Sequence, residues 1–192
     1  MNIRAYFILF AIFMLAAFGA TSCQKPGTQA ARENPDLTSQ QILSIEDKAF
    51  LDKAEKAEMR QTTLSQLALE KSADEDVRRF ARHVIANYDR PLADLAGLMT
   101  AKKMAESSAA IEELKLDAIN RLHGLSGSAF DDEFVSLITA EQQAALATFN
   151  SAAETAADPD IRKYAQGVVP IIREDFDTVV SLEKQLAAKN RR

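Results

Sequence analysis

The chain has 192 residues, of which 47% are hydrophobic, and its formal net charge is −5 at pH 7. Its lysines and arginines are scattered, and without a basic patch to meet nucleic-acid phosphates we expect no nucleic-acid partner. Few glycines and prolines, together with abundant alanine, leucine, glutamate, lysine and glutamine, indicate an all-α protein.

The first residues have the layout of a secretory signal. Arg4 is the only charged side chain before a mostly apolar run, and small residues follow that run up to Ser22. A short positive start, an apolar middle and a small-residue cleavage site are the three parts of an export signal. We therefore expect residues 1–22 to be a signal peptide.

Cys23 is the only cysteine in the chain, and it directly follows the sequence ATS. This context resembles the lipobox of bacterial lipoproteins, in which the cysteine is acylated and becomes the first mature residue. Ala20 stands where that motif usually has Leu. Two alternatives stay open: an ordinary signal peptidase could cut after Ala20 or Ser22, or an uncleaved helix could anchor the chain. Gln24, rather than Asp, follows the cysteine, which in Gram-negative lipoproteins implies the outer membrane.

A flexible tether is expected between the membrane anchor and the folded domain. From Gln24 to Asp36 the chain has no large apolar side chain, and the sequences KPG and NPD break any helix. We therefore divide the mature chain into a tether over 23–37, a helical domain over 38–188 and a basic tail over 189–192.

The folded domain is predicted to be helical throughout. Apolar residues recur there every three or four positions, which predicts amphipathic helices with one face toward a common core. The expected helices cover residues 39–72, 75–103, 109–123, 129–156 and 159–188. The third is short, ends at Gly124 and Gly127, and lies on the connection between the first two helices and the last two.

An internal repeat indicates how these helices are arranged. The sequence ADEDVRRFA, which starts at Ala73, returns 84 residues later as ADPDIRKYA, and this offset pairs Phe80 with Tyr164. Each copy contains an aspartate suited to cap a helix, Asp74 and Asp158. Two repeated helical hairpins joined by a long connection predict a four-helix bundle of the ferritin-like type.

Polar residues interrupt the apolar stripes near the middle of the four long helices. In an antiparallel bundle such residues fall at one level, and ferritin-like proteins build their metal sites at this level. The candidate residues of this mid-bundle level are Gln61, Tyr88, Glu141, Gln142 and Asp175.

Four stretches carry a resemblance to a known family: FLDKAEKAEMRQTTLSQLALEKS, DVRRFARHVIANYD, LSGSAFDDEFV and DIRKYAQGVVPIIREDF. Over residues 47–186 the chain resembles the bacterial domain of unknown function 4142, a family of ferritin-like exported proteins described as predicted outer membrane proteins. The resemblance implies export and a ferritin-like bundle.

The chain departs from the family pattern at the middle of the bundle. The pattern usually has a Glu on the first helix, an Asp-His pair on the second, a His on the fourth and a His after the proline of the last. The matching positions here are Gln61, Asn87 with Tyr88, Gln142 and Asp175, so all three histidines are absent. The resemblance therefore implies a site whose usual ligands this chain lacks.

Metal binding is also disfavoured by the residue types themselves. The Glu-x-x-His spacing of di-metal bundles does not occur, and the only histidines are His83 and His123. Glu141 and Asp175 could hold a hard cation weakly, whereas the alternative is a hydrogen-bonded polar layer without metal. Ligand count favours the second interpretation, and we expect no cofactor.

Pro91 falls inside the second predicted helix, where it removes one backbone hydrogen bond. It frees the carbonyl group of Asn87, next to Tyr88. Two consequences are open: a simple kink, or a widened pocket beside the polar level.

These observations lead to two hypotheses about function. The sequence has no glycine-rich phosphate loop, no CxxC pair and no serine nucleophile motif, so we expect no enzyme and no catalytic residues. The favoured hypothesis is a lipid-anchored envelope domain, facing the periplasm, that binds an unknown protein or small molecule or takes part in envelope stress. The alternative is a ferritin-like metal-binding or redox protein that uses the mid-bundle site.

Overall fold

Residues 43–104 and 118–191 are described by the computed structural model. The expected signal peptide, Cys23 and the tether lie outside these residues, as do residues 109–117 of the expected short helix. Of the helices described, none combines the length and the apolar character that a membrane span needs. The helices are α1 (Ile45–Lys71), α2 (Glu75–Ala101), α4 (Ala118–His123), α5 (Gly127–Thr155) and α6 (Pro159–Lys189).

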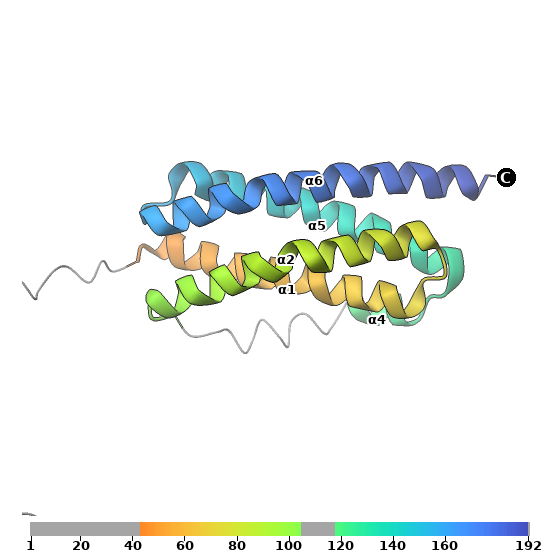
Figure 1. The fold of residues 1–192 in the computed structure, drawn as a ribbon, viewed down its shortest axis with the longest axis horizontal. Coiled ribbons are helices and arrows are strands. Elements are labelled where there is room, and N and C mark those ends of the chain that lie inside the picture. The colour runs from red at the N-terminus through yellow and green to blue at the C-terminus, as the bar shows by residue number, and fades with distance from the viewer. Residues whose placement is uncertain (1–42, 105–117, 192) are drawn as a thin grey trace, which may run out of the picture. The chain divides into compact units, whose positions relative to one another are not determined.

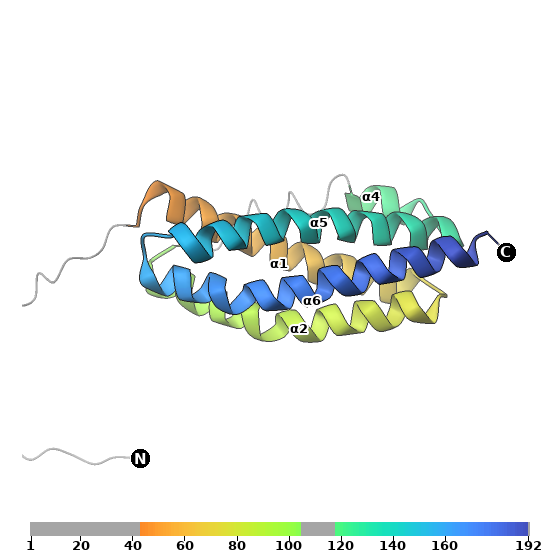
Figure 2. The same cartoon turned by 90° about the horizontal axis from the view of Figure 1, so that it is seen from above.

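Four long helices form a bundle of two antiparallel hairpins, α1 with α2 and α5 with α6 (Figure 1). Each long helix packs on two neighbours: α1 lies against α2 and α5, and α6 lies against α5 and α2. Figure 2 shows the same arrangement from above, with the short α4 beside the first turns of α5. The all-α bundle with a short additional helix on the connection is confirmed.

The observed helix boundaries differ from the expected ones by a few residues. Helix α5 begins at Gly127, two residues earlier than predicted. Gly127 itself has a φ of +57°, a left-handed conformation that a glycine adopts without strain at the turn into the helix. Helix α2 ends at Ala101, ahead of Lys103, which also has a positive φ. Helix α6 continues to Lys189, one residue beyond the expected end of the last helix.

Two apolar clusters fill the two ends of the bundle. The cluster near the α1–α2 turn contains Phe80 and Phe134, whose rings pack edge to face with their centroids 6.5 Å apart. The cluster at the other end contains Phe50 and Phe149, with ring centroids 5.2 Å apart. Burial of these aromatic side chains stabilises the fold by roughly 2 kcal/mol each. The polar residues discussed below belong to the middle third of the helices, between these aromatic pairs.

The two hairpin turns have nearly identical caps, as the repeat predicts. Asp74 Oδ1 accepts hydrogen bonds from the backbone N–H groups two and three residues further on, at 2.8 and 3.2 Å. Asp158 Oδ1 accepts the equivalent pair at 2.9 and 3.3 Å. Each cap satisfies two N–H groups that the first turn of a helix leaves unpaired.

The contact between α2 and α6, which we call the seam, is closed at both ends by an ion-pair clasp. In each clasp, a lysine at the C-terminal end of one helix contacts two aspartates at the N-terminal end of the other. The Nζ atom of Lys102 lies 2.7 and 2.8 Å from Asp158 and Asp160, and that of Lys189 lies 2.7 and 2.8 Å from Asp74 and Asp76.

Candidate functional site

A closed layer of polar side chains crosses the middle of the bundle. Each of these side chains is at most 1% exposed, although each could hydrogen-bond to water on the surface. The layer consists of Glu58, Gln61, Tyr88, Gln142 and Asp175, from all four long helices. Four of these five are the residues that sequence reasoning placed here.

A chain of neutral hydrogen bonds links three helices within the layer. The hydroxyl group of Tyr88 on α2 donates to Oε1 of Gln142 on α5, at 3.5 Å. The amide group of Gln142 donates to Oε1 of Gln61 on α1, at 3.4 Å. These long bonds compensate part of the cost of burying three polar side chains, and they add no charge to the core.

Glu141 lies outside the layer, although the sequence placed it next to Gln142 in the same site. Successive residues of a helix point about 100° apart, so only one of the two can face the bundle axis. The carboxylate of Glu141 accepts a hydrogen bond from Arg60 Nη1 at 3.0 Å, on the surface between α1 and α5. The expected carboxylate pair of Glu141 and Asp175 therefore does not form in the layer.

Asp175 is the point where the layer approaches the surface. Its Oδ1 atom accepts a hydrogen bond from Asn87 at 3.0 Å and lies 3.3 Å from Nε2 of His83. Its Oδ2 atom is buried without a hydrogen-bond partner. Burial raises the pKa of Asp175 to about 6, against the opposing effects of Asn87 and His83. The side chain of His83 is 37% exposed, so the contacts of Asp175 reach the surface at this histidine.

Glu58 is a member of the layer that sequence reasoning missed. The hydroxyl group of Tyr164 on α6 donates to its Oε1 atom, and its Oε2 atom has no partner. Burial raises the pKa of Glu58 to about 8, and the charge of Asp94 adds to this rise. Glu58 follows Ala54 by four positions and precedes Gln61 by three, so the helical spacing alone placed it on the buried stripe.

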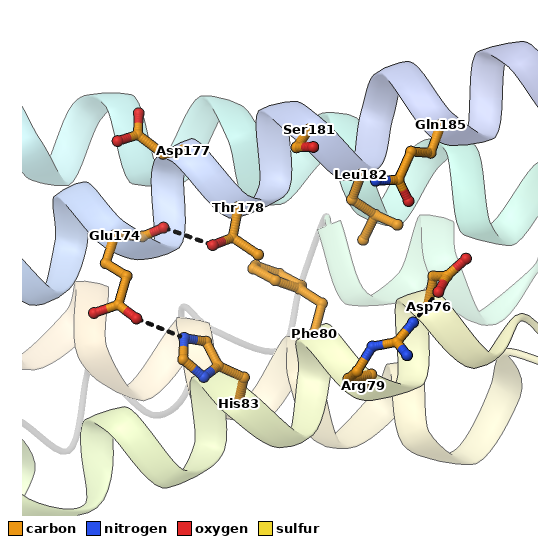
Figure 3. A pocket seen from close by; sticks show the side chains of 10 residues that line it. All are labelled: Asp76, Arg79, Phe80, His83, Glu174, Asp177, Thr178, Ser181, Leu182 and Gln185. Carbon is orange, nitrogen blue, oxygen red and sulfur yellow. Dashed lines mark hydrogen bonds and ion pairs between the residues drawn. The ribbon is translucent and has the colours of Figure 1, made fainter.

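Two open grooves lie along the seam between α2 and α6, one on each side of the Asp175 contacts. The first, the His83 groove, has a volume of about 560 Å³ and runs from Asp76 to His83 on α2. In Figure 3, Phe80 and Leu182 lie between the two helices, and His83 points toward Glu174.

The second groove, the Pro91 groove, has a volume of about 650 Å³. It lies between the Asn87–Leu98 part of α2 and the Asp160–Ile171 part of α6. Pro91 itself lines the groove, which agrees with the open alternative of a pocket beside the polar layer. Tyr164 also lines it and connects it to Glu58 below.

The polar layer does not fit a transition-metal centre. Among the residues that the structure describes, no three histidine, cysteine, aspartate or glutamate side chains are arranged to hold a metal ion. Gln61, Tyr88 and Gln142 offer neutral amide and phenol groups, which are weak ligands for such metals.

The fold and the mid-bundle polar layer define a four-helix bundle with a polar middle, and a comparison with family sequences gives the family. Residues 32–182 match the family described as "Domain of unknown function (DUF4142)", and the chain belongs to this family. No sequence among the curated proteins matches the chain.

Solved structures with similar folds come from other helical proteins. A DUF305 fragment from Deinococcus radiodurans is 15% identical, with a TM-score of 0.63 over 74% of this chain and 98% of that one. A candidate secreted DUF305 protein from Streptomyces coelicolor is 14% identical, with a TM-score of 0.62 over 74% of this chain and 94% of that one. CopM in its Cu(II)-bound form is 13% identical, with a TM-score of 0.58 over 72% of this chain and 96% of that one. At these identities the likeness concerns the fold.

Proposed function

We propose that the protein is an exported, lipid-anchored binding domain of the bacterial cell envelope, without catalytic chemistry of its own. The observation that carries this proposal is the closure of the polar layer. A catalytic acid or base has to come within hydrogen-bond reach of its substrate. Glu58, Tyr88 and Asp175 are at most 1% exposed, which leaves a substrate no access to them.

Binding is instead assigned to the surface along the seam. The His83 groove and the Pro91 groove have volumes of about 560 and 650 Å³, within the range of about 300–1,000 Å³ that is usual for small-molecule sites. The partner is a small molecule or a protein that presents a small group to these grooves. The acidic net charge of −5 argues against nucleic acid.

The proposed location rests on the N-terminal sequence. The apolar run before Cys23 is suited to export, and acylation of Cys23 would attach the domain to a membrane. Gln24 favours the outer membrane, with the bundle facing the periplasm. The fold likeness to a candidate secreted DUF305 protein is consistent with export.

The alternative function, metal binding at the middle of the bundle, has one observation in its favour. CopM, whose fold is similar, has a solved structure described as the Cu(II)-bound form. Against this stands the donor set of the layer, in which Asp175 and Glu58 are the only carboxyl groups and no histidine is a member. We therefore place this alternative second.

The anchor is tested by replacing Cys23 with Ser and separating cell membranes from soluble proteins. We expect the wild-type chain in the membrane fraction and Cys23→Ser in the soluble fraction. A wild-type chain that is already soluble, or a variant that stays in the membrane, would show that the anchor is assigned wrongly.

The binding role is tested by native mass spectrometry of the chain purified from its own membrane. We expect a noncovalently held molecule that is retained when the polar layer is altered by Tyr88→Phe with Asp175→Asn. These substitutions keep the shapes of the side chains. Loss of the molecule from this folded variant would place the function in the layer and contradict the proposal.

A further inference from the structure

The Pro91 groove has a predominantly apolar lining. Its apolar side chains come from both helices: Pro91, Leu98, Val168 and Ile171. Gly167 leaves its floor open, because a Cβ atom at this position would meet no other atom within 4 Å. A ligand with an extended hydrocarbon part would therefore cover apolar surface that otherwise faces water.

The charged residues around this groove leave one positive charge unpaired. Arg90 lies 3.5 Å from Asp94, and Asp160 lies 2.8 Å from Lys102. Lys163 also lines the groove, and it has no ion-pair partner within the described ranges 43–104 and 118–191. The charges of the lining balance, and Lys163 is the charged side chain among them that is left to pair with a ligand.

The position of Lys163 suits an elongated ligand. Lys163 and Gly167 are four residues apart on α6, so they lie on the same helix face, one turn from each other. Lys163 thus lines the groove one helical turn from the open position at Gly167. Glu58, which lies behind Tyr164, has its pKa raised to about 8 by burial and is mostly uncharged at neutral pH. It does not repel an anion in the groove.

The His83 groove provides an internal control, because the repeat places it in the equivalent position. At the offset of 84 residues, Lys163 corresponds to Arg79 and Gly167 corresponds to His83. Arg79 is paired with Asp76, and the His83 side chain lines the groove (Figure 3), at the position that Gly167 has in the other copy. The two copies therefore differ at two matching positions: the Pro91 groove has Lys163 and a glycine, and the His83 groove has a paired arginine and an imidazole.

We propose that the Pro91 groove binds a single-chain carboxylate amphiphile, that is, a free fatty acid. The hydrocarbon chain lies along Pro91, Leu98 and Ile171, and the carboxylate pairs with Lys163. This inference rests on the proposed function and names the ligand class of its binding surface.

The test is calorimetric titration of the soluble Cys23→Ser chain with decanoate below its micelle concentration, so that no detergent competes. We expect one binding site in the parent chain and in the control Gly97→Leu, which lies outside the groove. Gly167→Leu fills the floor and is expected to weaken binding at least about tenfold. Both leucines enter open space on exposed helix positions and improve helix propensity, so both variants keep the fold.

A second pair of variants tests the charge. Lys163→Gln is expected to weaken decanoate binding about fivefold, and Lys184→Gln, an exposed lysine of the same helix, is expected to leave it unchanged. Decyltrimethylammonium, which has a similar chain and the opposite charge, is expected to bind more weakly than decanoate.

Absence of decanoate binding to the parent chain, equal binding by Gly167→Leu and Gly97→Leu, or tighter binding of the cation would each overturn the inference. The proposed function fails separately, through the fractionation of Cys23→Ser or through a retained molecule that depends on the polar layer. A retained molecule of another class, in a chain that does not bind decanoate, would refute the ligand class alone.

Discussion

The two grooves on the seam are copies of one architecture, and they differ where a ligand would lie. The aspartates at their outer ends, Asp76 and Asp160, are the same in both copies of the repeat, and both contact a lysine of the neighbouring helix. In the middle, His83 of one groove corresponds to Gly167 of the other. The repeat has thus kept the residues that hold α2 against α6 and has changed the residues between them.

The polar layer shows the same difference between ends and middle. At the offset of 84 residues, Glu58 corresponds to Gln142, and Tyr164 corresponds to Phe80. The hydroxyl group of Tyr164 donates a hydrogen bond to Glu58. Phe80 has no donor for Gln142, which accepts a hydrogen bond from Tyr88 instead. The helix turns and the ion-pair clasps are alike in the two hairpins, because both hairpins need them to fold. The two hairpins differ in the polar residues at the middle of their helices.

The largest expected effect comes from Glu58→Gln, which gives position 58 the same residue as its counterpart in the repeat, Gln142. The pKa of Glu58 is raised from 4.5 to about 8, so the folded chain keeps this proton while the unfolded chain loses it. Stability from this group is therefore fully present below pH 4.5 and is lost as the pH rises through 8. The Glu58→Gln substitution would remove that loss, which is on the order of 4 kcal/mol at pH 9.

Urea unfolding at several pH values measures this effect. The variant and the wild type are expected to be equally stable at pH 4, and the variant is expected to be more stable at pH 9. A variant that loses stability at pH 9 would contradict the buried, uncharged state of Glu58.

The next effect compares two equivalent aspartates at the turns, Asp47 and Asp131. Asp47 is 2% exposed and accepts hydrogen bonds from the backbone N–H groups of Ala157 and Asp158, at 3.1 and 2.9 Å. Asp131 is 6% exposed, its Oδ1 atom has no partner, and burial raises its pKa. Asp47→Ala should destabilise by about 3 kcal/mol, because it leaves two N–H groups unpaired.

Asp131→Ala is the matched control and should cost less than about 1 kcal/mol. Thermal unfolding of the two variants under one set of conditions gives the comparison. Equal losses would mean that the two turns are stabilised in the same way.

A third effect concerns Asp175, whose counterpart in the repeat is Pro91. Asp175→Ala removes the acceptor for Asn87 and leaves space in the core, and we expect a loss of about 1–3 kcal/mol. Asp175→Asn keeps the shape and should cost less. Chemical denaturation at pH 5 separates the two, and a larger loss in Asp175→Asn would argue that the charge of Asp175 is needed.

The smallest effect comes from the two clasps. Lys102 is 17% exposed and Lys189 is 48% exposed, so solvent screens the second clasp more strongly. Lys102→Gln should destabilise by about 1 kcal/mol, and Lys189→Gln should destabilise by less. Repeating the unfolding curves in concentrated salt should reduce both differences, and a salt-independent loss would assign the effect to packing of the lysine stems.

Much of the fold could be predicted from the sequence, because helical spacing and the 84-residue repeat are both written in it. Gln61, Tyr88, Gln142 and Asp175 were found because each interrupts an apolar stripe. Sequence reasoning misses Glu58 because its neighbour Ala57 also fits the apolar stripe of the first helix.

The grooves required the structure. Periodicity shows that a residue faces another helix but not which helix. The match of His83 with Gly167 therefore points to a pair of grooves only once α2 is known to pack against α6. Likewise, the sequence does not show that Arg79 is paired with Asp76 while Lys163, among the described residues, has no ion pair. Pairing of charges depends on side-chain geometry and not on spacing alone.

The central claim is that the middle of the bundle is a closed polar layer and not a metal site, and calorimetric titration of the wild-type chain with Cu(II) and Zn(II) tests it directly. We predict no one-to-one binding that depends on the layer. As a positive control, Gln61→Glu combined with Tyr88→His, Gln142→His and Asp175→His should gain a site. One equivalent of either metal bound by the wild type and lost in Asp175→Asn would contradict the account.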